Sequence, residues 1–475
     1  MFDLWIEGWK LRELILNNEV RPREAAEFFL DRIERLNSKI GAFMTLTAER
    51  ALEDAARLER LPAPARASLP LYGIPFSLKD LTWTKGIRTT LGSKNFENFV
   101  PRADQEYAAR IMAAGGILLG KTTTPEFGGK PTTDGGLCPT AHNPWDLSRT
   151  AGGSSGGAAA SVAAGMNPVA EGSDGGGSIR LPAACCSLVG IKPSRGRVSN
   201  APVMGEGWAG FATNGPLTRS VRDAALLLDV MSGPAAGDPY WAPPPSCSFV
   251  DALKLRPRHL RLAAIAETSL ASVDPEVRAT FDTACKTMVA MGHRIEPLKL
   301  DPAALLKDIG QTLICAGISS IPLHDPDAVD PIVRAAWENG RRLSASEYIA
   351  TVAKMHNVSR QIVQELLPYD ALLTPTLPYP AVKLGTLYRS PEDSLEATFG
   401  WIPFTFPFNA TGQPAISLPN GFTGSGLPIG LQIVGRPADE VGMTRSPQPL
   451  KRRAPGTTNT LPLRIEQPLQ DRISD

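Results

Sequence analysis

The feature that most constrains this 475-residue chain is the stretch 150–193, which carries two serines in glycine-rich loops. Ser154 occurs in GGSSGG and Ser178 in DGGGSIR, and the small residues 158–164 lie between them. Glycine lets main-chain N–H groups come close to a ligand. We therefore predict two glycine loops that each open a helix and place both serines near unpaired N–H donors. A flexible linker is the alternative, but the run AAASVAA and the apolar residues 188–191 argue against it.

Composition excludes several classes of function. The net charge of +1 argues against a nucleic-acid surface, and no apolar run is long enough to span a bilayer. The N-terminus lacks the pattern of a secretory signal. Six scattered cysteines include no CxxC motif, so we expect reduced thiols and no metal site. These features predict a cytoplasmic protein with no nucleic-acid or membrane partner.

The order of apolar patterns predicts an α/β fold. Residues 104–114 have helical amphipathicity, GlyGly ends the pattern, and residues 117–121 follow as a short apolar strand. Other helices are predicted where apolar residues recur at helical spacing, and other strands in short apolar runs. The helices are expected at 24–36, 51–61, 218–231 and 275–291, and the strands at 71–81, 260–266, 294–296 and 369–375.

Lys79 stands near the end of the apolar run 71–81. A buried ammonium is costly, so either its stem lies on the core while the amine reaches water, or the lysine is neutral. A neutral lysine can act as a general base for a serine nucleophile. Of the five histidines, only His142 precedes the serine stretch closely enough to compete, with a structural loop role as its alternative. The N–H groups of Gly175, Gly176 and Gly177 are predicted to form an oxyanion hole.

Several segments carry a resemblance to a known family. They are GIPFSLKD (73–80), GKTTTPEF (120–127), and residues 143–165, 171–199, 215–223 and 407–437. Over about residues 1 to 442, the chain resembles the amidase signature family of serine hydrolases. The resemblance implies a large mixed β-sheet surrounded by α-helices. It also implies a Ser–cisSer–Lys triad in which Ser178 is the nucleophile, Ser154 the bridging serine and Lys79 the base, with no cofactor.

The resemblance also implies a substrate pocket. Gly128, Gly129, Ser155 and Cys315 are predicted to bind substrate, while Asp174 and Arg180 are predicted either to orient the site or to be purely structural. Apolar residues that recur in the loops are candidate pocket walls, each with a core role as its alternative. Besides Gly128, Gly129 and Cys315, the candidates are Trp83, Phe127, Cys138, Trp208, Phe211, Ile314 and Trp401.

The predicted function is hydrolysis of small-molecule amides by a monomer or homodimer. Aryl and alkyl amides, anilides, carbamates and nylon-type oligoamides are candidate substrates. GKTTTPEF, ARIMAAGG and the TLIC segment around Cys315 add a weaker resemblance to hydrolases that open cyclic nylon-type oligoamides. One alternative is the glutaminase subunit of the tRNA-dependent amidotransferase, although no arginine/aspartate pair for an α-amino acid is evident. Another is a non-catalytic binding module, which would be expected to lack a triad residue.

The last segment departs from the family pattern. Residues 443–475 are polar and Pro-rich, where the family closes with an amphipathic helix. We therefore predict a single domain over residues 1–442 and a poorly ordered tail beyond it.

Overall fold

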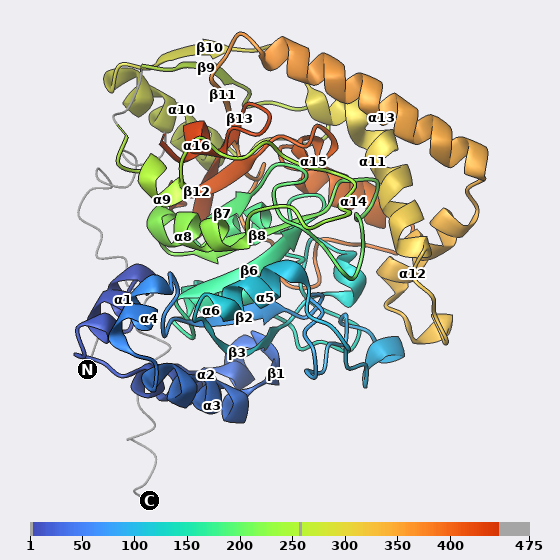
Figure 1. The fold of residues 1–475 in the computed structure, drawn as a ribbon. Coiled ribbons are helices and arrows are strands. Elements are labelled where there is room, and N and C mark those ends of the chain that lie inside the picture. Colours follow the sequence, from blue (N-terminus) through green and yellow to red (C-terminus); the bar gives the residue numbers. More distant parts are fainter. Residues whose placement is uncertain (1–2, 256–258, 446–475) are drawn as a thin grey trace, which may run out of the picture.

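The computed structural model describes residues 3–255 and 259–445, and at its centre lies an 11-stranded mixed sheet (Figure 1). The strand order is β1-β3-β2-β6-β8-β7-β12-β13-β11-β9-β10. Strand β2 pairs in parallel with β3 and β6, and β9 pairs in parallel with β10 and β11, whereas the other pairs are antiparallel. The predicted large mixed sheet with surrounding helices is confirmed.

The elements follow in chain order. The strands of the large sheet are β1 Phe43–Leu46, β2 Pro75–Lys79, β3 Ile117–Thr122, β6 Val169–Asp174, β7 Val189–Lys192, β8 Thr213–Thr218, β9 Arg261–Ala264, β10 Arg294–Pro297, β11 Ala371–Pro375, β12 Ala415–Phe422 and β13 Pro428–Gly435; a separate hairpin consists of β4 His142–Asn143 and β5 Asp146–Thr150. The helices are α1 Gly8–Leu16, α2 Pro22–Ile40, α3 Ala48–Glu59, α4 Ala63–Ser68, α5 Glu106–Ala113, α6 Gly156–Ala163, α7 Arg180–Cys185, α8 Val221–Met231, α9 Phe249–Ala252, α10 Pro275–Ala290, α11 Pro302–Ser319, α12 Pro331–Arg341, α13 Ala345–Leu366, α14 Ser394–Trp401, α15 Pro407–Ala410 and α16 Glu440–Arg445.

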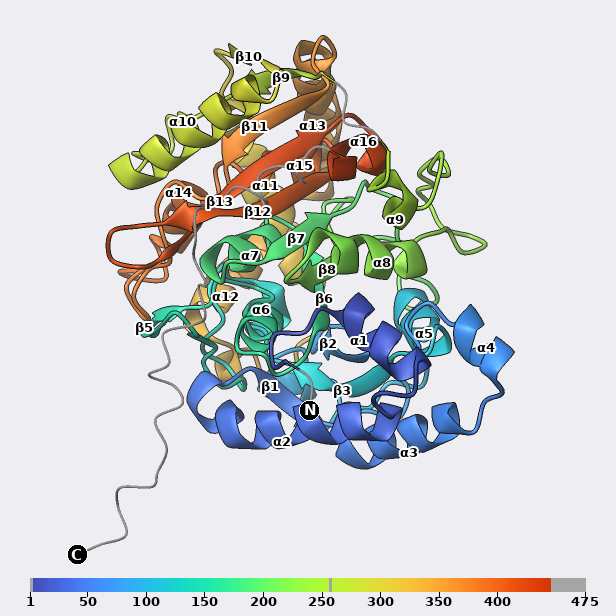
Figure 2. The ribbon, with the colours of Figure 1, turned by 90° about the vertical axis from the view of Figure 1, so that its left-hand side faces the viewer.

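Alternation along β3 explains why helices cover both faces of the sheet. Ile117 and Leu119 belong to one apolar core cluster, and Leu118 between them belongs to the other. Successive side chains of a strand point to opposite faces, so a strand buried on both sides reads as a continuous apolar run. Helices α2, α3, α6, α7 and α11 supply the first cluster, and α5, α8 and α10 supply the second. In Figures 1 and 2, α2 and α3 lie beside the β1 end of the sheet and α10 beside β9 and β10.

The C-terminal boundary differs from the prediction. The predicted tail begins at residue 443, but Met443 is buried within α16. Glu440, at the start of this helix, pairs with Arg197 at 2.9 Å and accepts a hydrogen bond from the Ser194 N–H at 2.9 Å. Helix α16 therefore continues to Arg445, and the rest of the predicted tail lies outside the described residues. Within the described residues, no helix combines the length and apolarity needed to cross a membrane.

Candidate active site

Lys79 and Ser154 meet in the interior of the molecule. Lys79 is the last residue of β2, its side chain is fully buried, and its Nζ lies 2.7 Å from Ser154 Oγ and 2.9 Å from Ser173 Oγ. Burial lowers the pKa of Lys79 to about 7, although the nearby carboxylates of Glu171 and Asp174 act in the opposite direction. The alternative in which the amine reaches water is therefore wrong, and burial favours the neutral form of the amine.

Geometry rather than pKa singles out Lys79 among the buried lysines. Burial also lowers the pKa of Lys121 to about 8 and that of Lys192 to about 7. Lys121 Nζ donates to the hydroxyls of Thr84 and Thr89, and Lys192 Nζ donates to the Pro193 carbonyl at 2.9 Å. Of these three amines, Lys79 is the one that contacts a serine of the 150–193 stretch.

Glycines allow the Ser154 loop to pass between neighbouring backbones. The Gly153–Ser154 peptide is cis, and Gly152 has φ +83°. A Cβ at Gly152 would lie 2.8 Å from Pro182 Cα, and one at Gly157 would lie 2.5 Å from Thr123 N. Larger residues would therefore clash with main-chain atoms. The predicted small-residue helix is confirmed as α6, which begins directly after Ser154 and Ser155.

Ser178 lies between α7 and the three glycines 175–177, which are called the glycine loop below. Its carbonyl accepts a hydrogen bond from the Ser155 N–H at 3.2 Å, which ties the two serine loops together. Ser178 is partly exposed, whereas Ser154 and Lys79 are buried. Of the three predicted catalytic residues, Ser178 is thus the one open to a substrate.

One of the three glycine N–H groups predicted to form the oxyanion hole is already hydrogen-bonded within the protein. The Gly177 N–H donates to Asp174 Oδ1 at 2.7 Å, so in this structure it is not available to an oxyanion. In the described part of the chain, no residue accepts a hydrogen bond from the N–H groups of Gly175, Gly176 or Ser178. The available donors are therefore two of the three predicted glycines and the serine itself.

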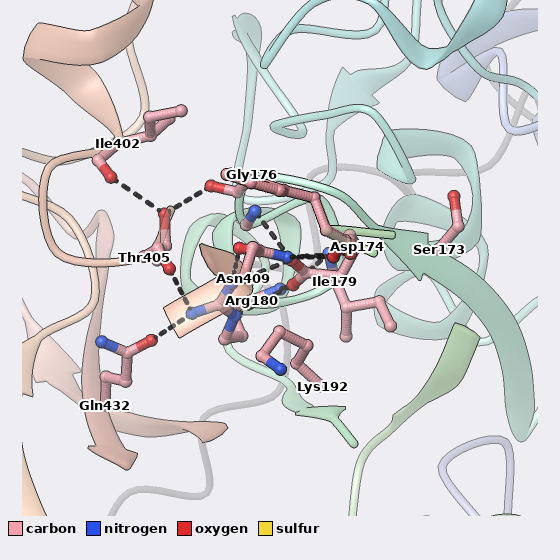
Figure 3. A network of polar contacts seen from close by, with 12 residues as sticks. Ser173, Asp174, Gly176, Ile179, Arg180, Lys192, Ile402, Thr405, Asn409 and Gln432 are labelled. Carbon is pink, nitrogen blue, oxygen red and sulfur yellow. Dashed lines mark hydrogen bonds and ion pairs between the residues drawn. The ribbon is translucent and has the colours of Figure 1, made fainter. Parts of the chain in front are cut away.

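A buried ion pair lies beneath this loop (Figure 3). Arg180 Nη2 and Asp174 Oδ1 are 2.8 Å apart, and both side chains are fully buried. Burial alone would raise the pKa of Asp174, but Arg180 holds it well below the usual range. Arg180 also donates to the Thr405 carbonyl at 2.8 Å, to Gln432 Oε1 at 2.7 Å and to Asn409 Oδ1 at 2.7 Å.

The four predicted substrate-binding residues have different surroundings. A Cβ at Gly128 would lie 3.1 Å from Ser154 Oγ, whereas one at Gly129 would contact Ile318 and Val333 at 3.3 Å. Ser155 is fully buried and its hydroxyl donates to the Ser173 carbonyl at 3.1 Å, so its side chain is not placed to bind substrate. Cys315 is buried in α11, and burial raises the pKa of its thiol to about 11. Of the four, Gly128 is the one where an added side chain would contact the Ser154 hydroxyl, whereas Ser155 contacts Ser178 through its backbone N–H.

Most predicted pocket walls belong to the core, but Trp208 borders the glycine loop. A Cβ at Gly175 would lie 2.9 Å from the Trp208 indole, which is partly exposed. His142 is on the β4–β5 hairpin, with Nδ1 2.7 Å from the Leu147 carbonyl, which fits its structural alternative. Unlike Trp208, six of the predicted pocket walls are buried in the core: Phe127, Cys138, Phe211, Ile314, Cys315 and Trp401.

Sequence reasoning missed four polar residues at the site. Ser173 contacts the Lys79 amine, and it is visible in the sequence beside Asp174 in the EGSDGGGS motif. Thr405, Asn409 and Gln432 reach the glycine loop or Arg180 from segments more than 200 residues away in sequence. They lie in or beside the motifs PFNATGQ and GLQIVG, but neither motif has a spacing that indicates their contacts.

Comparison with known proteins identifies the family. The Amidase family model matches residues 24–443. The acylamidase of Rhodococcus erythropolis is 34% identical over 453 residues, 91% of this chain and 92% of the relative. A glutamyl-tRNA(Gln) amidotransferase subunit of Geotalea daltonii is 34% identical over 475 residues, 94% of this chain and 96% of the relative. The structure of 6-aminohexanoate cyclic dimer hydrolase complexed with substrate superposes with a TM-score of 0.88 and 30% identity, covering 96% of this chain and 98% of that one. Both resemblances predicted from the motifs are thereby confirmed, and the chain belongs to the amidase signature family of amide-cleaving hydrolases.

Proposed function

We propose that this amidase cleaves amides of small molecules through an acyl-enzyme on Ser178, with Ser154 and Lys79 as its proton relay. The observation that carries the proposal is the 2.7 Å contact between the fully buried Lys79 Nζ and Ser154 Oγ. A lysine whose pKa is lowered to about 7 can accept a proton near neutral pH.

In the first half-reaction, the Ser178 Oγ attacks the amide carbonyl carbon. Its proton passes to Ser154, whose own proton passes to the neutral Lys79 amine. The carbonyl oxygen becomes an oxyanion, which the N–H groups of Gly175, Gly176 and Ser178 are available to bind. The C–N bond then breaks, the relay returns the proton to the leaving nitrogen, and an ester remains on Ser178.

In the second half-reaction, water attacks the ester carbonyl. The relay takes the proton of the water, the C–O bond to Ser178 breaks, and the Ser178 Oγ regains its proton. The products are the free carboxylic acid and the regenerated hydroxyl. The cycle therefore needs no group other than the chain's own residues and water.

For the substrate, we propose an aryl or alkyl amide, with anilides, carbamates and nylon-type oligoamides as members of the class. The partly exposed Trp208 beside Gly175 gives the glycine loop an aromatic neighbour, which suits an apolar substituent. The relatives named acylamidase and 6-aminohexanoate cyclic dimer hydrolase support this class.

The second candidate is the glutaminase subunit of a tRNA-dependent amidotransferase. It is favoured by the 34% identity to the amidotransferase subunit from Geotalea daltonii. The two functions differ in the amide that is cleaved and in the need for further protein partners, while the proposed relay would serve both.

The test compares the wild-type protein with Ser178→Ala, without partner or ATP. Release of nitroaniline from an acyl nitroanilide by the wild type but not by the variant supports the stand-alone amidase. Ammonia release from glutamine with no anilide or ester cleavage would move the function to the glutaminase. Equal release by both proteins would refute Ser178 as the nucleophile.

A further inference from the structure

We propose that Thr405 is a positioning residue for the oxyanion donors, assisted by Asn409. The inference rests on the proposed function of the glycine loop, and it assigns the task of orienting the loop to a segment that begins more than 220 residues later in sequence. Neither side chain lies in the predicted triad, and both are buried.

The loop needs anchors from outside because it contains three consecutive glycines. Glycine has the widest conformational freedom, and it offers no side chain that could be packed to fix its peptide planes. An oxyanion hole is effective when its donors are already oriented before the charge develops. The Gly177 N–H is held by Asp174 Oδ1, and the carbonyl groups of residues 174–178 are the other atoms through which the peptide planes can be fixed.

Two of these carbonyl groups are held by the proposed pair (Figure 3). Thr405 Oγ1 donates to the Gly176 carbonyl at 2.8 Å, and Asn409 Nδ2 donates to the Asp174 carbonyl at 2.9 Å. In a trans peptide, the carbonyl and the following N–H point in opposite directions. Asn409 thus sets the direction of the Gly175 N–H. Thr405 fixes the peptide plane that joins Gly176 to Gly177, and this plane lies between the two peptides that carry the Gly176 and Ser178 N–H groups.

The Thr405 contact is also close enough to be sensitive to small changes. A Cβ at Gly177 would approach Thr405 Cβ within 2.8 Å, and Gly177 has φ +129°, which favours glycine. The hydroxyl has a single proton and a second carbonyl acceptor, that of Ile402 at 3.1 Å. A change that removes this proton frees the Gly176 carbonyl without altering the ion pair beneath it.

The decisive variants are Thr405→Val, which keeps the shape and removes the donor, and Thr405→Ser, which keeps the donor. Thr376→Val is the matched control, because Thr376 is equally buried but bonds to Ser417 Oγ at 2.9 Å, away from the loop. Each protein is measured for kcat, KM, melting temperature and hydrogen–deuterium exchange of the peptide that spans residues 170–182.

We expect Thr405→Val to lower kcat about 10- to 100-fold with little change in KM, since a displaced oxyanion donor costs transition-state rather than ground-state binding. Exchange in residues 170–182 should accelerate about tenfold, while Thr405→Ser and Thr376→Val should resemble the wild type. Unchanged exchange in Thr405→Val, or equal losses in the valine and serine variants, would overturn the inference. If exchange rises as expected but the wild-type activity does not depend on Ser178, the proposed function fails and the positioning of the loop stands.

Discussion

Two buried charged clusters meet at residues 171–180, and they differ in how completely their polar atoms are satisfied. The arginine cluster consists of Arg180, Asp174, Asn409, Thr405 and Gln432, and the lysine cluster of Lys79, Lys121, Glu171 and Asp80. In the described structure, Glu171 Oε1 and Asp80 Oδ1 are buried without a hydrogen-bond partner, whereas no side-chain atom of the arginine cluster is in that condition.

This difference suits the arginine cluster to holding the glycine loop in place and the lysine cluster to transferring protons. The arginine cluster keeps its charges, because Arg180 holds the pKa of Asp174 well below its usual range against the effect of burial. In the lysine cluster, burial lowers the pKa of Lys79 to about 7 and that of Lys121 to about 8, and it raises the pKa of Glu171. A fully satisfied ion pair is suited to rigidity, and groups that titrate near neutrality are suited to acid–base chemistry.

Loss of the Lys79 amine should give the largest effect. We expect Lys79→Met to lower kcat/KM by about 10³-fold or more, because no general base remains in contact with Ser154. Steady-state kinetics at neutral pH will measure it. Lys121→Met is the control, since Lys121 is equally buried but contacts threonines. A Lys79→Met enzyme with nearly full rate would exclude the relay.

The second-largest effect should be the loss of stability when the ion pair of the arginine cluster is broken. Asp174→Asn leaves the Arg180 charge buried without its carboxylate, which typically costs about 3–5 kcal/mol in the free energy of unfolding. Urea denaturation will measure this loss. The control is Glu267→Gln, which removes an exposed partner of Arg278 and should leave the unfolding curve nearly unchanged. Similar curves for the two variants would argue against a structural role for the ion pair.

The smallest expected effect is a shift of the pH profile in Glu171→Gln. The Glu171 carboxylate raises the pKa of Lys79, so its removal should move the midpoint of the acid limb of kcat/KM to lower pH, by about one unit or less. Asp80→Asn is the control, because Asp80 acts on the pKa of Lys121. An unchanged midpoint would mean that Glu171 is already neutral in the active enzyme.

The small-residue helix could be predicted from the local pattern. The mixed sheet and the meeting of Lys79 with Ser154 were predicted from the resemblance to the amidase signature family, which rests on dense motifs. The direction of the Gly177 N–H was not predictable, because it depends on which N–H groups donate hydrogen bonds to the Asp174 carboxylate. Ser154 and Ser155 look equivalent in the sequence, yet the Ser154 hydroxyl contacts the Lys79 amine, whereas the Ser155 hydroxyl donates a hydrogen bond to the Ser173 carbonyl in β6. Thr405 acts through a backbone carbonyl, and such a contact imposes no recognisable spacing on the sequence.

The proposed mechanism requires that the neutral form of Lys79 accept a proton from Ser178 through Ser154. Its most direct test is the rate of acylation of Ser178, measured by stopped-flow release of nitroaniline from about pH 5.5 to 9. We expect a rate that rises with pH through a single ionisation near the Lys79 pKa of about 7, and the loss of this rise in Lys79→Met. A rate that is independent of pH, or a rise that persists without Lys79, would contradict it.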